Sequence, residues 1–139
     1  MAFVHGKSAV FKLDNSSGSL VDYSAYLDNV GFPRSVDTAE TTTFGVSGSA
    51  KTYIVGLSDA TVSLSGLFDA TADATLAGVL GQAATISFEY GPAGSTAGLI
   101  KYSGEAIMKS YQVTAAVGDS VKASVELQVT GAVTRGTWA

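Results

Sequence analysis

The C-terminal third of the chain alternates apolar and polar residues over a span much longer than an ordinary strand. The apolar positions are Val121, Ala123, Val125, Leu127, Val129 and Val133, with Gly131 in step. The positions between them are Lys122, Ser124, Glu126, Gln128, Thr130 and Thr134. Successive side chains of a strand point to opposite faces of the sheet. The pattern therefore predicts one long antiparallel strand with a buried face and a polar face.

A second run with the same period comes directly before it and predicts a partner strand. One face would carry Ile107, Tyr111, Val113, Ala115 and Val117, and the other Met108, Ser110, Gln112, Thr114 and Ala116. Residues 118–120, Gly-Asp-Ser, separate the two runs and are typical of a hairpin turn.

Shorter signals complete a mainly β fold. Alternating runs at 61–68 and 84–90 predict two more strands, and runs at 8–13 and 19–27 flank a turn-forming stretch at 14–18. One helix is expected at about residues 70–80, because Asp69 or Thr71 can cap its start and Gly81 can end it. We predict a single domain over residues 1–139, an antiparallel β-sandwich or barrel with one short α-helix.

Residues 41–58 follow neither period and contain three glycines, yet they also carry apolar side chains. A loop this long without secondary structure is uncommon in a compact domain and is usually functional. We therefore expect a long irregular loop that binds a partner, with an edge strand tucked under the domain as the alternative. The candidate contact residues of this loop are Phe44, Lys51, Tyr53, Ile54 and Val55.

Charge is sparse along the whole chain. Eight Lys and Arg against 12 Asp and Glu give a net charge of -4, and charged residues make up 14% of the chain, below the roughly 25% of an ordinary domain. Isolated basic residues do not make a phosphate-binding surface. Low charge favours a subunit covered by copies of itself, although a sparsely charged monomer has the same composition. No run suggests a membrane span or an export signal.

No motif supports catalysis, a cofactor or a metal. Residues 45–52 match a phosphate-binding loop except at Ala50, where that loop needs glycine, and no helix is expected after them. The stretch at 14–18 lacks the closing glutamate of a calcium loop. His5 is the single histidine and lies near a terminus, and the chain has no cysteine. We therefore predict a protein that is not an enzyme, with no catalytic, cofactor-binding or metal-binding residues.

Several short segments follow one another in a distinctive order. They read YLDNV at 26–30, FPRSVD at 32–37, ETTTFG at 40–45 and AKTYIVGLSD at 50–59. LSGLFD at 64–69, a short helix, YGP at 90–92 and the long closing strands come after them. This order, over nearly the whole chain, resembles the major tail tube proteins of long-tailed, siphovirus-type bacteriophages, particularly those of actinobacterial phages.

The resemblance implies a structural protein of the virion tail, assembled in the bacterial host cytoplasm. Copies would form hexameric rings that stack into a tube around a tape measure protein, between tail terminator and tip proteins. DNA would pass through the lumen without specific binding. Two alternatives stay open: a monomeric β-sandwich binding module, such as a carbohydrate-binding or adhesion domain, and the tube subunit of a contractile tail or phage-like particle.

Under this resemblance the loop at 41–58 would connect stacked rings, and one strand face would line the channel. A lysine or arginine on the wall would slow DNA by binding phosphate, so we expect a polar wall with little positive charge. The candidate channel-lining residues are Ser110, Gln112, Thr114, Ser124, Glu126, Gln128 and Thr130.

Overall fold

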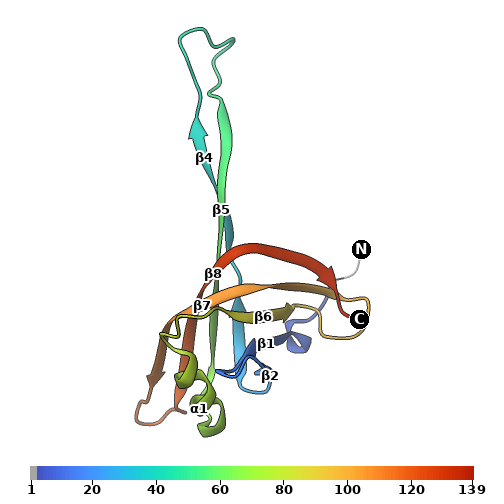
Figure 1. Cartoon of the computed structure of the whole chain (residues 1–139), viewed down its shortest axis with the longest axis vertical. Helices are drawn as coiled ribbons and strands as arrows, with labels where there is room; N and C mark the ends of the chain where they lie inside the picture. Colours follow the sequence, from blue (N-terminus) through green and yellow to red (C-terminus); the bar gives the residue numbers. More distant parts are fainter. Residues whose placement is uncertain (1–2) are drawn as a thin grey trace.

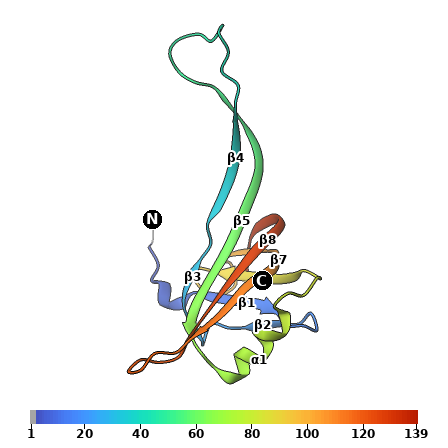
Figure 2. The ribbon, with the colours of Figure 1, turned by 90° about the vertical axis from the view of Figure 1, so that its left-hand side faces the viewer.

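Residues 3–139, the part of the chain that the computed structural model describes, form one curled antiparallel sheet with a long projecting hairpin (Figure 1, Figure 2). The strands are β1 (Val10–Asp14), β2 (Leu20–Asp22), β3 (Leu27–Gly31), β4 (Arg34–Glu40), β5 (Tyr53–Leu67), β6 (Ile86–Gly91), β7 (Ile100–Thr114) and β8 (Lys122–Thr137). A short 3-10 turn, η1 (Gly6–Ser8), precedes β1, and the helix α1 (Ala70–Val79) connects β5 to β6. The hydrogen-bonded order is β2-β1-β6-β7-β8-β5-β3, and β4 pairs with β5 beyond the end of β3.

The concave side of the sheet holds the hydrophobic core. Val125, Leu127 and Val129 of β8 are buried there, which confirms the period-two pattern of the C-terminal third. Each side chain of this size that is fully buried contributes about 1.5–3 kcal/mol. The rest of the buried apolar core consists of Phe11, Leu13, Tyr23, Ala60, Val62, Leu64, Ala72, Leu76, Val79, Ile86, Phe88, Ala106 and Met108.

Helix α1 closes the end of the curled sheet below the core (Figure 1). It begins as expected, because the Asp69 carboxylate accepts hydrogen bonds from the backbone N–H groups of Thr71 and Ala72 at 3.0 and 3.2 Å. It ends just before Gly81, which has a φ of 76°. Leu76 and other apolar residues of one helix face are buried against the sheet, so the expected helix at about 70–80 is confirmed.

One expectation for β7 is wrong at two residues, Ile107 and Met108. Met108 is buried in the core, and Ile107, which we expected on the apolar face, is exposed on the polar one. The pairing with β8 shifts between Met108 and Ser110, where Lys109 is an extra residue that forms a β-bulge. An extra residue reverses which face the following side chains occupy, so Tyr111 returns to the core side as expected.

The loop expected at 41–58 is shorter than its sequence suggested. Residues 53–58 belong to β5, where they pair with β4, and the irregular part is limited to 41–52. Both faces of this part of the strand are exposed, so neither face has to be apolar. The sequence at 53–55 therefore has three apolar residues in a row and no alternation. Backbone pairing with β4, which one segment alone cannot reveal, makes it a strand.

Candidate functional site

A two-stranded arm, formed by β4, residues 41–52 and the first half of β5, extends well beyond the body of the molecule (Figure 1, Figure 2). Residues 34–40 and 53–59 are exposed on both faces of this ribbon. The alternative of an edge strand tucked under the domain is therefore wrong. β8 pairs with β5 only from Thr61 to Leu67. Within the arm, the edge of β5 that faces away from β4 therefore has no strand beside it. A two-stranded ribbon alone is marginally stable in water, which favours a partner that covers it.

The first strand of the arm is anchored in the core through an aromatic cluster. The ring of Phe32 contacts Phe88 edge-on at 5.8 Å between centroids and Tyr102 at 5.6 Å. Arg34, the first residue of β4, has its guanidinium 4.8 Å from the centre of the Tyr102 ring. Cation–π contact of this kind stabilises the pair by about 0.5–1 kcal/mol at an exposed site. The arm is thus fixed to the rigid part of the sheet.

The second strand of the arm is anchored where β5 and β8 separate. The Gln128 amide donates a 2.7 Å hydrogen bond to the carboxylate of Asp59 and a 3.2 Å bond to the backbone carbonyl of Ala60. Gly131, with a φ of 86°, lies in β8 just beyond this point. Its left-handed conformation, unfavourable for other residues, lets β8 bend away from β5 while the arm continues in its own direction.

The tip of the arm is tied together by threonines. The Thr41 and Thr52 hydroxyls are 2.9 Å apart, and the Thr52 backbone N–H donates to the Thr42 hydroxyl at 3.0 Å. Beyond this closure Phe44 is fully exposed, with a relative accessibility of 112%. Tyr53, Ile54 and Val55 are also more than half exposed. The candidate contact residues of the arm therefore lie together on it, and Lys51 is the one charged residue of 41–52.

The seven candidate channel-lining residues share the face of the sheet opposite the core. Direct neighbours across the β7–β8 pair are Ser110 with Glu126, Gln112 with Ser124, and Thr114 with Lys122. Further along, Thr130 lies opposite Glu105, and Gln128 lies opposite Thr61 of β5. Paired residues of antiparallel strands point to the same face, so the structure brings these side chains onto one polar surface.

This polar sheet face is mainly uncharged, and three of its lysines are paired with anions, among them Lys122 with Asp119 at 3.5 Å, whereas the Lys12 ammonium lies over the Trp138 ring at 5.2 Å. Lys101 lies 3.2 Å from Glu89, and Lys109 lies 3.9 Å from Glu126. Glu105 accepts a 2.9 Å hydrogen bond from the Thr85 hydroxyl and another from Ser87. The exposed Lys109–Glu126 pair adds little stability, about 0–1 kcal/mol. The effect of these contacts is to leave few lysine ammonium groups free to bind phosphate.

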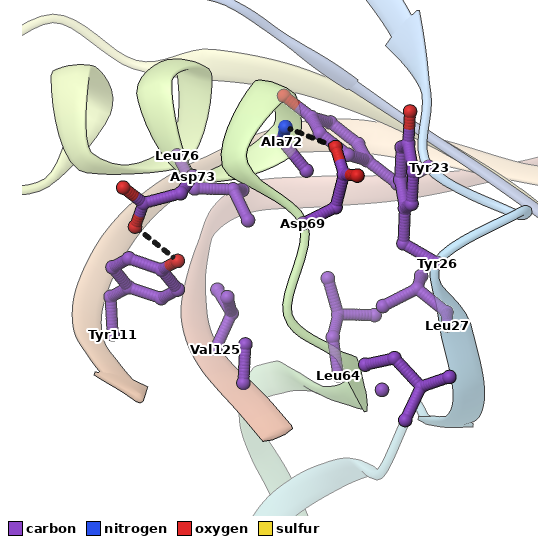
Figure 3. Close-up of a pocket in the computed structure, with 13 residues that line it drawn as sticks. Tyr23, Tyr26, Leu27, Leu64, Asp69, Ala72, Asp73, Leu76, Tyr111 and Val125 are labelled. Atoms are coloured by element: carbon purple, nitrogen blue, oxygen red, sulfur yellow. Dashed lines mark hydrogen bonds between the residues drawn. The ribbon is translucent and has the colours of Figure 1, made fainter. Parts of the chain in front are cut away.

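A small apolar cavity lies under α1, and the close-up in Figure 3 shows its lining. Its volume is about 20 Å³, which holds at most one water molecule. At its edge the Tyr111 hydroxyl donates a 2.6 Å hydrogen bond to the Asp73 carboxylate. Burial and this carboxylate raise the pKa of Tyr111 above its ordinary value. The cavity is too small for an organic ligand. The hydrogen bond between Tyr111 and Asp73 has a structural role, because it joins the helix to β7.

The motifs that resembled chemical sites have structural roles. Residues 45–52 lie at the tip of the arm and lead into a strand, whereas a phosphate-binding loop opens a helix. His5 accepts a hydrogen bond from the Lys7 backbone N–H at 3.1 Å and caps η1. Between residues 3 and 139 no three His, Asp or Glu side chains are grouped to hold a metal ion. In the same range no helix is long and apolar enough to cross a membrane.

Sequence reasoning missed part of the exposed apolar surface. Val36 and Leu57 are 51% and 81% exposed on the arm. At the opposite end of the molecule the β7–β8 turn exposes a second group of apolar side chains, and the strands around it add more. This base patch consists of Phe68, Val113, Val117 and Val121, whereas Leu67, which is also exposed, lies beside Lys122 on the polar sheet face. The sequence did indicate strands at these positions, but the alternation suggested that Val113, Val117 and Val121 face the core.

Comparisons with known proteins agree with this geometry. The family model described as phage tail tube protein matches residues 3–135. No curated protein sequence matches the chain. In the tail of an empty gene transfer agent particle, refined with C6 symmetry, a chain with 18% identity covers 95% of this chain and 98% of its own length, with a TM-score of 0.81.

Two further solved structures have the same fold. A chain of the SPP1 tail tube is 17% identical and gives a TM-score of 0.68, covering 97% of this chain and 80% of its own. A chain of the sheath–tube complex of an extracellular contractile injection system, in the extended state, is 14% identical with a TM-score of 0.67. It covers 97% of this chain and 92% of its own. At these identities the likeness establishes the fold.

Proposed function

Because this chain belongs to the phage tail tube protein family, we propose that it is a structural subunit whose copies form hexameric rings that stack into a tail tube. The observation that carries the proposal is the family match over residues 3–135, which spans every strand from β1 to the greater part of β8. The protein acts in the virion tail as the wall of the channel through which DNA leaves the particle. It is not an enzyme.

The arm supports ring-to-ring contact. Phe44, Tyr53, Ile54 and Val55 are exposed on a projection that no other part of the described chain covers, and interface anchors are commonly aromatic or aliphatic side chains of this kind. Lys51 adds one cation for a carboxylate of the neighbouring ring. The anchoring of both arm strands to the core means that little freedom is lost when a partner binds.

The polar sheet face supports the channel wall. Ser110, Gln112, Thr114, Ser124, Glu126, Gln128 and Thr130 face away from the core on paired strands, and the lysines nearest to them are ion-paired. A wall of this composition offers hydrogen bonds but few phosphate contacts. DNA would then slide through it, and the tape measure, terminator and tip proteins would be the other partners of the tube. Assembly would take place in the host cytoplasm.

Electron microscopy of the concentrated, purified protein tests both the tube and the role of the arm. The natural sequence should form sixfold rings and tubes with a central channel. Replacing Phe44, Tyr53, Ile54 and Val55 with serine should leave rings or monomers that do not elongate. The circular dichroism spectrum should not change, because all four side chains are exposed.

A matched variant keeps the same positions apolar, with Phe44→Tyr, Tyr53→Phe, Ile54→Val and Val55→Ile, and should still form tubes. Tubes of normal length from the serine variant would contradict the role of the arm. Natural protein that stays monomeric at millimolar concentration, and is absent from any tube in particles, would contradict the proposed function and favour a monomeric binding module. A contracting sheath around the tube in such particles would identify the contractile class.

A further inference from the structure

The single tryptophan of the chain, Trp138, directly follows β8, and its ring contacts Lys12 and Lys101 on the polar sheet face. Its backbone N–H donates to the Leu99 carbonyl at 3.0 Å, and its carbonyl accepts from the Gly98 N–H at 2.9 Å. These two bonds tie the end of β8 to the connection between β6 and β7 (Figure 1). The backbone therefore sets the place of the indole.

The indole packs on β6, where a glycine leaves room for it. A Cβ added to Gly91 would come within 2.7 Å of the Trp138 Nε1 atom and 2.3 Å of the Gly94 carbonyl oxygen, so a larger residue would displace the ring. The Nε1 atom is buried and has no hydrogen-bond acceptor within residues 3–139. An unpaired buried N–H opposes this placement, so other contacts of the ring must stabilise it.

Two lysines provide such contacts. The Lys12 ammonium lies 5.2 Å from the centre of the Trp138 ring, and the Lys101 ammonium lies 5.1 Å from it. An ammonium within about 6 Å of an aromatic ring is attracted by its π electrons. Both lysine side chains are half-buried, whereas Lys109 and Lys122 on the same sheet face are exposed.

One carboxylate serves these two lysines. Glu89 lies 3.2 Å from the Lys101 ammonium and directly opposite Lys12 across the β1–β6 pair. Two cations and one anion leave an excess of positive charge, and the ammonium without an ion-pair distance to Glu89 is that of Lys12. On a surface that DNA slides past, such a cation would bind phosphate.

We propose that Trp138 is a positioning residue of the channel wall, which holds the Lys12 ammonium against its ring and away from the phosphates of passing DNA. The indole does not remove the charge. It covers the lysine stem and fixes its direction, so the ammonium does not extend from the sheet as an exposed lysine would. This inference rests on the proposed function, because a channel for DNA gives the shielding its role.

Lysine reactivity tests the shielding in the free subunit. Trp138→Leu keeps an apolar side chain over Gly91 but removes the π face, and Trp138→Phe is the matched control that retains one. In the leucine variant N-hydroxysuccinimide acetate should modify Lys12 roughly two- to fivefold faster than in the natural protein, as expected for the loss of one cation–π contact. In the phenylalanine variant the rate should stay close to the natural one.

The exposed Lys109 and Lys122 serve as internal controls, and mass spectrometry resolves each lysine. Their rates should be the same in all three proteins. Equal Lys12 rates in the leucine and phenylalanine variants would overturn the inference, as would a rise at all lysines together.

Affinity for a short DNA duplex tests the consequence. The leucine variant should bind more tightly than the natural protein, and the slope of log affinity against log salt should become steeper by about one, because one more lysine reaches phosphate. Adding Lys12→Gln should return both quantities to their natural values. No gain in affinity, or a gain that persists without Lys12, would overturn the inference. Unsubstituted protein that never forms tubes would count against the proposed function, whereas the Lys12 rates do not depend on tubes.

Discussion

At the scale of single residues, the contact between Tyr111 and Asp73 shows how a side chain joins α1 to the sheet. The hydroxyl of Tyr111, on β7, donates to a carboxylate on the first turn of the helix at 2.6 Å (Figure 3). A hydrogen bond to a charged group contributes about 1.5–3 kcal/mol when both groups stay in place. The bond also requires the phenol to keep its proton.

We expect the stabilising effect of Tyr111 to decrease at alkaline pH. The folded pKa of this tyrosine is raised, first by burial and then by Asp73, so the folded state holds its proton more tightly than the unfolded chain does. Its contribution is therefore complete below the unfolded pKa of about 10 and is lost as pH rises through the folded value. Thermal melts at pH 8 and at pH 11 measure the change.

The comparison variant for this prediction is Tyr111→Phe. At pH 8 it should melt below the natural protein, because Asp73 loses its donor, and the difference should shrink at pH 11, where the unfolded chain has begun to lose the tyrosine proton. The ring itself is retained, so packing against the cavity is little changed. A difference between the two proteins that stays constant across this range would contradict the assignment.

At the scale of elements, glycines decide how closely two strands approach. Gly66 lies in β5 beside the irregular end of β3, where a Cβ added to this glycine would come within 2.0 Å of the Tyr26 carbonyl oxygen and 2.7 Å of the Leu27 Cα. Both are backbone atoms that cannot move without displacing β3. Gly78, in α1, has no atom within 4 Å of the corresponding position apart from its chain neighbours and the backbone of its own helix.

These two glycines form a matched pair for substitution by alanine. Gly66→Ala should destabilise the fold by about 1–3 kcal/mol, because it forces the strands apart. Gly78→Ala should stabilise it by about 0.5–1 kcal/mol, because alanine favours the helix. Urea unfolding followed by circular dichroism measures both. Equal effects of the two substitutions would show that β3 does not lie against Gly66.

At the scale of the whole molecule, the polar sheet face and the arm point to different parts of an assembly. One face of the curled sheet is filled with core, so the opposite face has to meet solvent, a neighbour or the channel. The arm leaves the sheet at one end and the base patch lies at the other (Figure 2). In the tube that we propose, built along this direction, the polar face would line the wall and the apolar ends would lie between rings.

Lysines placed on the polar sheet face test whether it lines the channel. Gln112→Lys and Thr130→Lys leave Gln128 free to hold Asp59, and both positions are exposed. Repeated around each ring, they would make a cationic band that binds phosphate. DNA ejection from otherwise normal particles should be slowed or incomplete, and salt should relieve the defect by screening.

The control places the same charges elsewhere. Ala74→Lys and Ala77→Lys add two lysines to the exposed side of α1, which covers the core side of the sheet, and should leave the ejection rate unchanged. Ejection at the natural rate from the Gln112 and Thr130 variant would place the polar face on the outside of the tube.

The sequence by itself determined most of the strands, the helix with its cap, the core positions of β8 and the polar identity of the opposite face, but it predicted neither β3 nor β4. Each of these depends on neighbouring residues: alternation fixes which side chains share a face, and Asp69 caps the helix two and three residues away. The same local information identified Phe44, Tyr53, Ile54 and Val55 as candidate contact residues. Their segment is apolar but has no helical or strand period, so no single face of it could be assigned to the core.

Only the tertiary structure decided where the elements go. The bulge at Lys109 moved Met108 into the core and Ile107 out of it, and its position depends on how β7 and β8 pair. The direction of the arm depends on Gln128 and Asp59, which are 69 residues apart and meet only because β5 lies beside β8. Such contacts form between segments distant in the chain, and a local pattern has no information about which strands become neighbours.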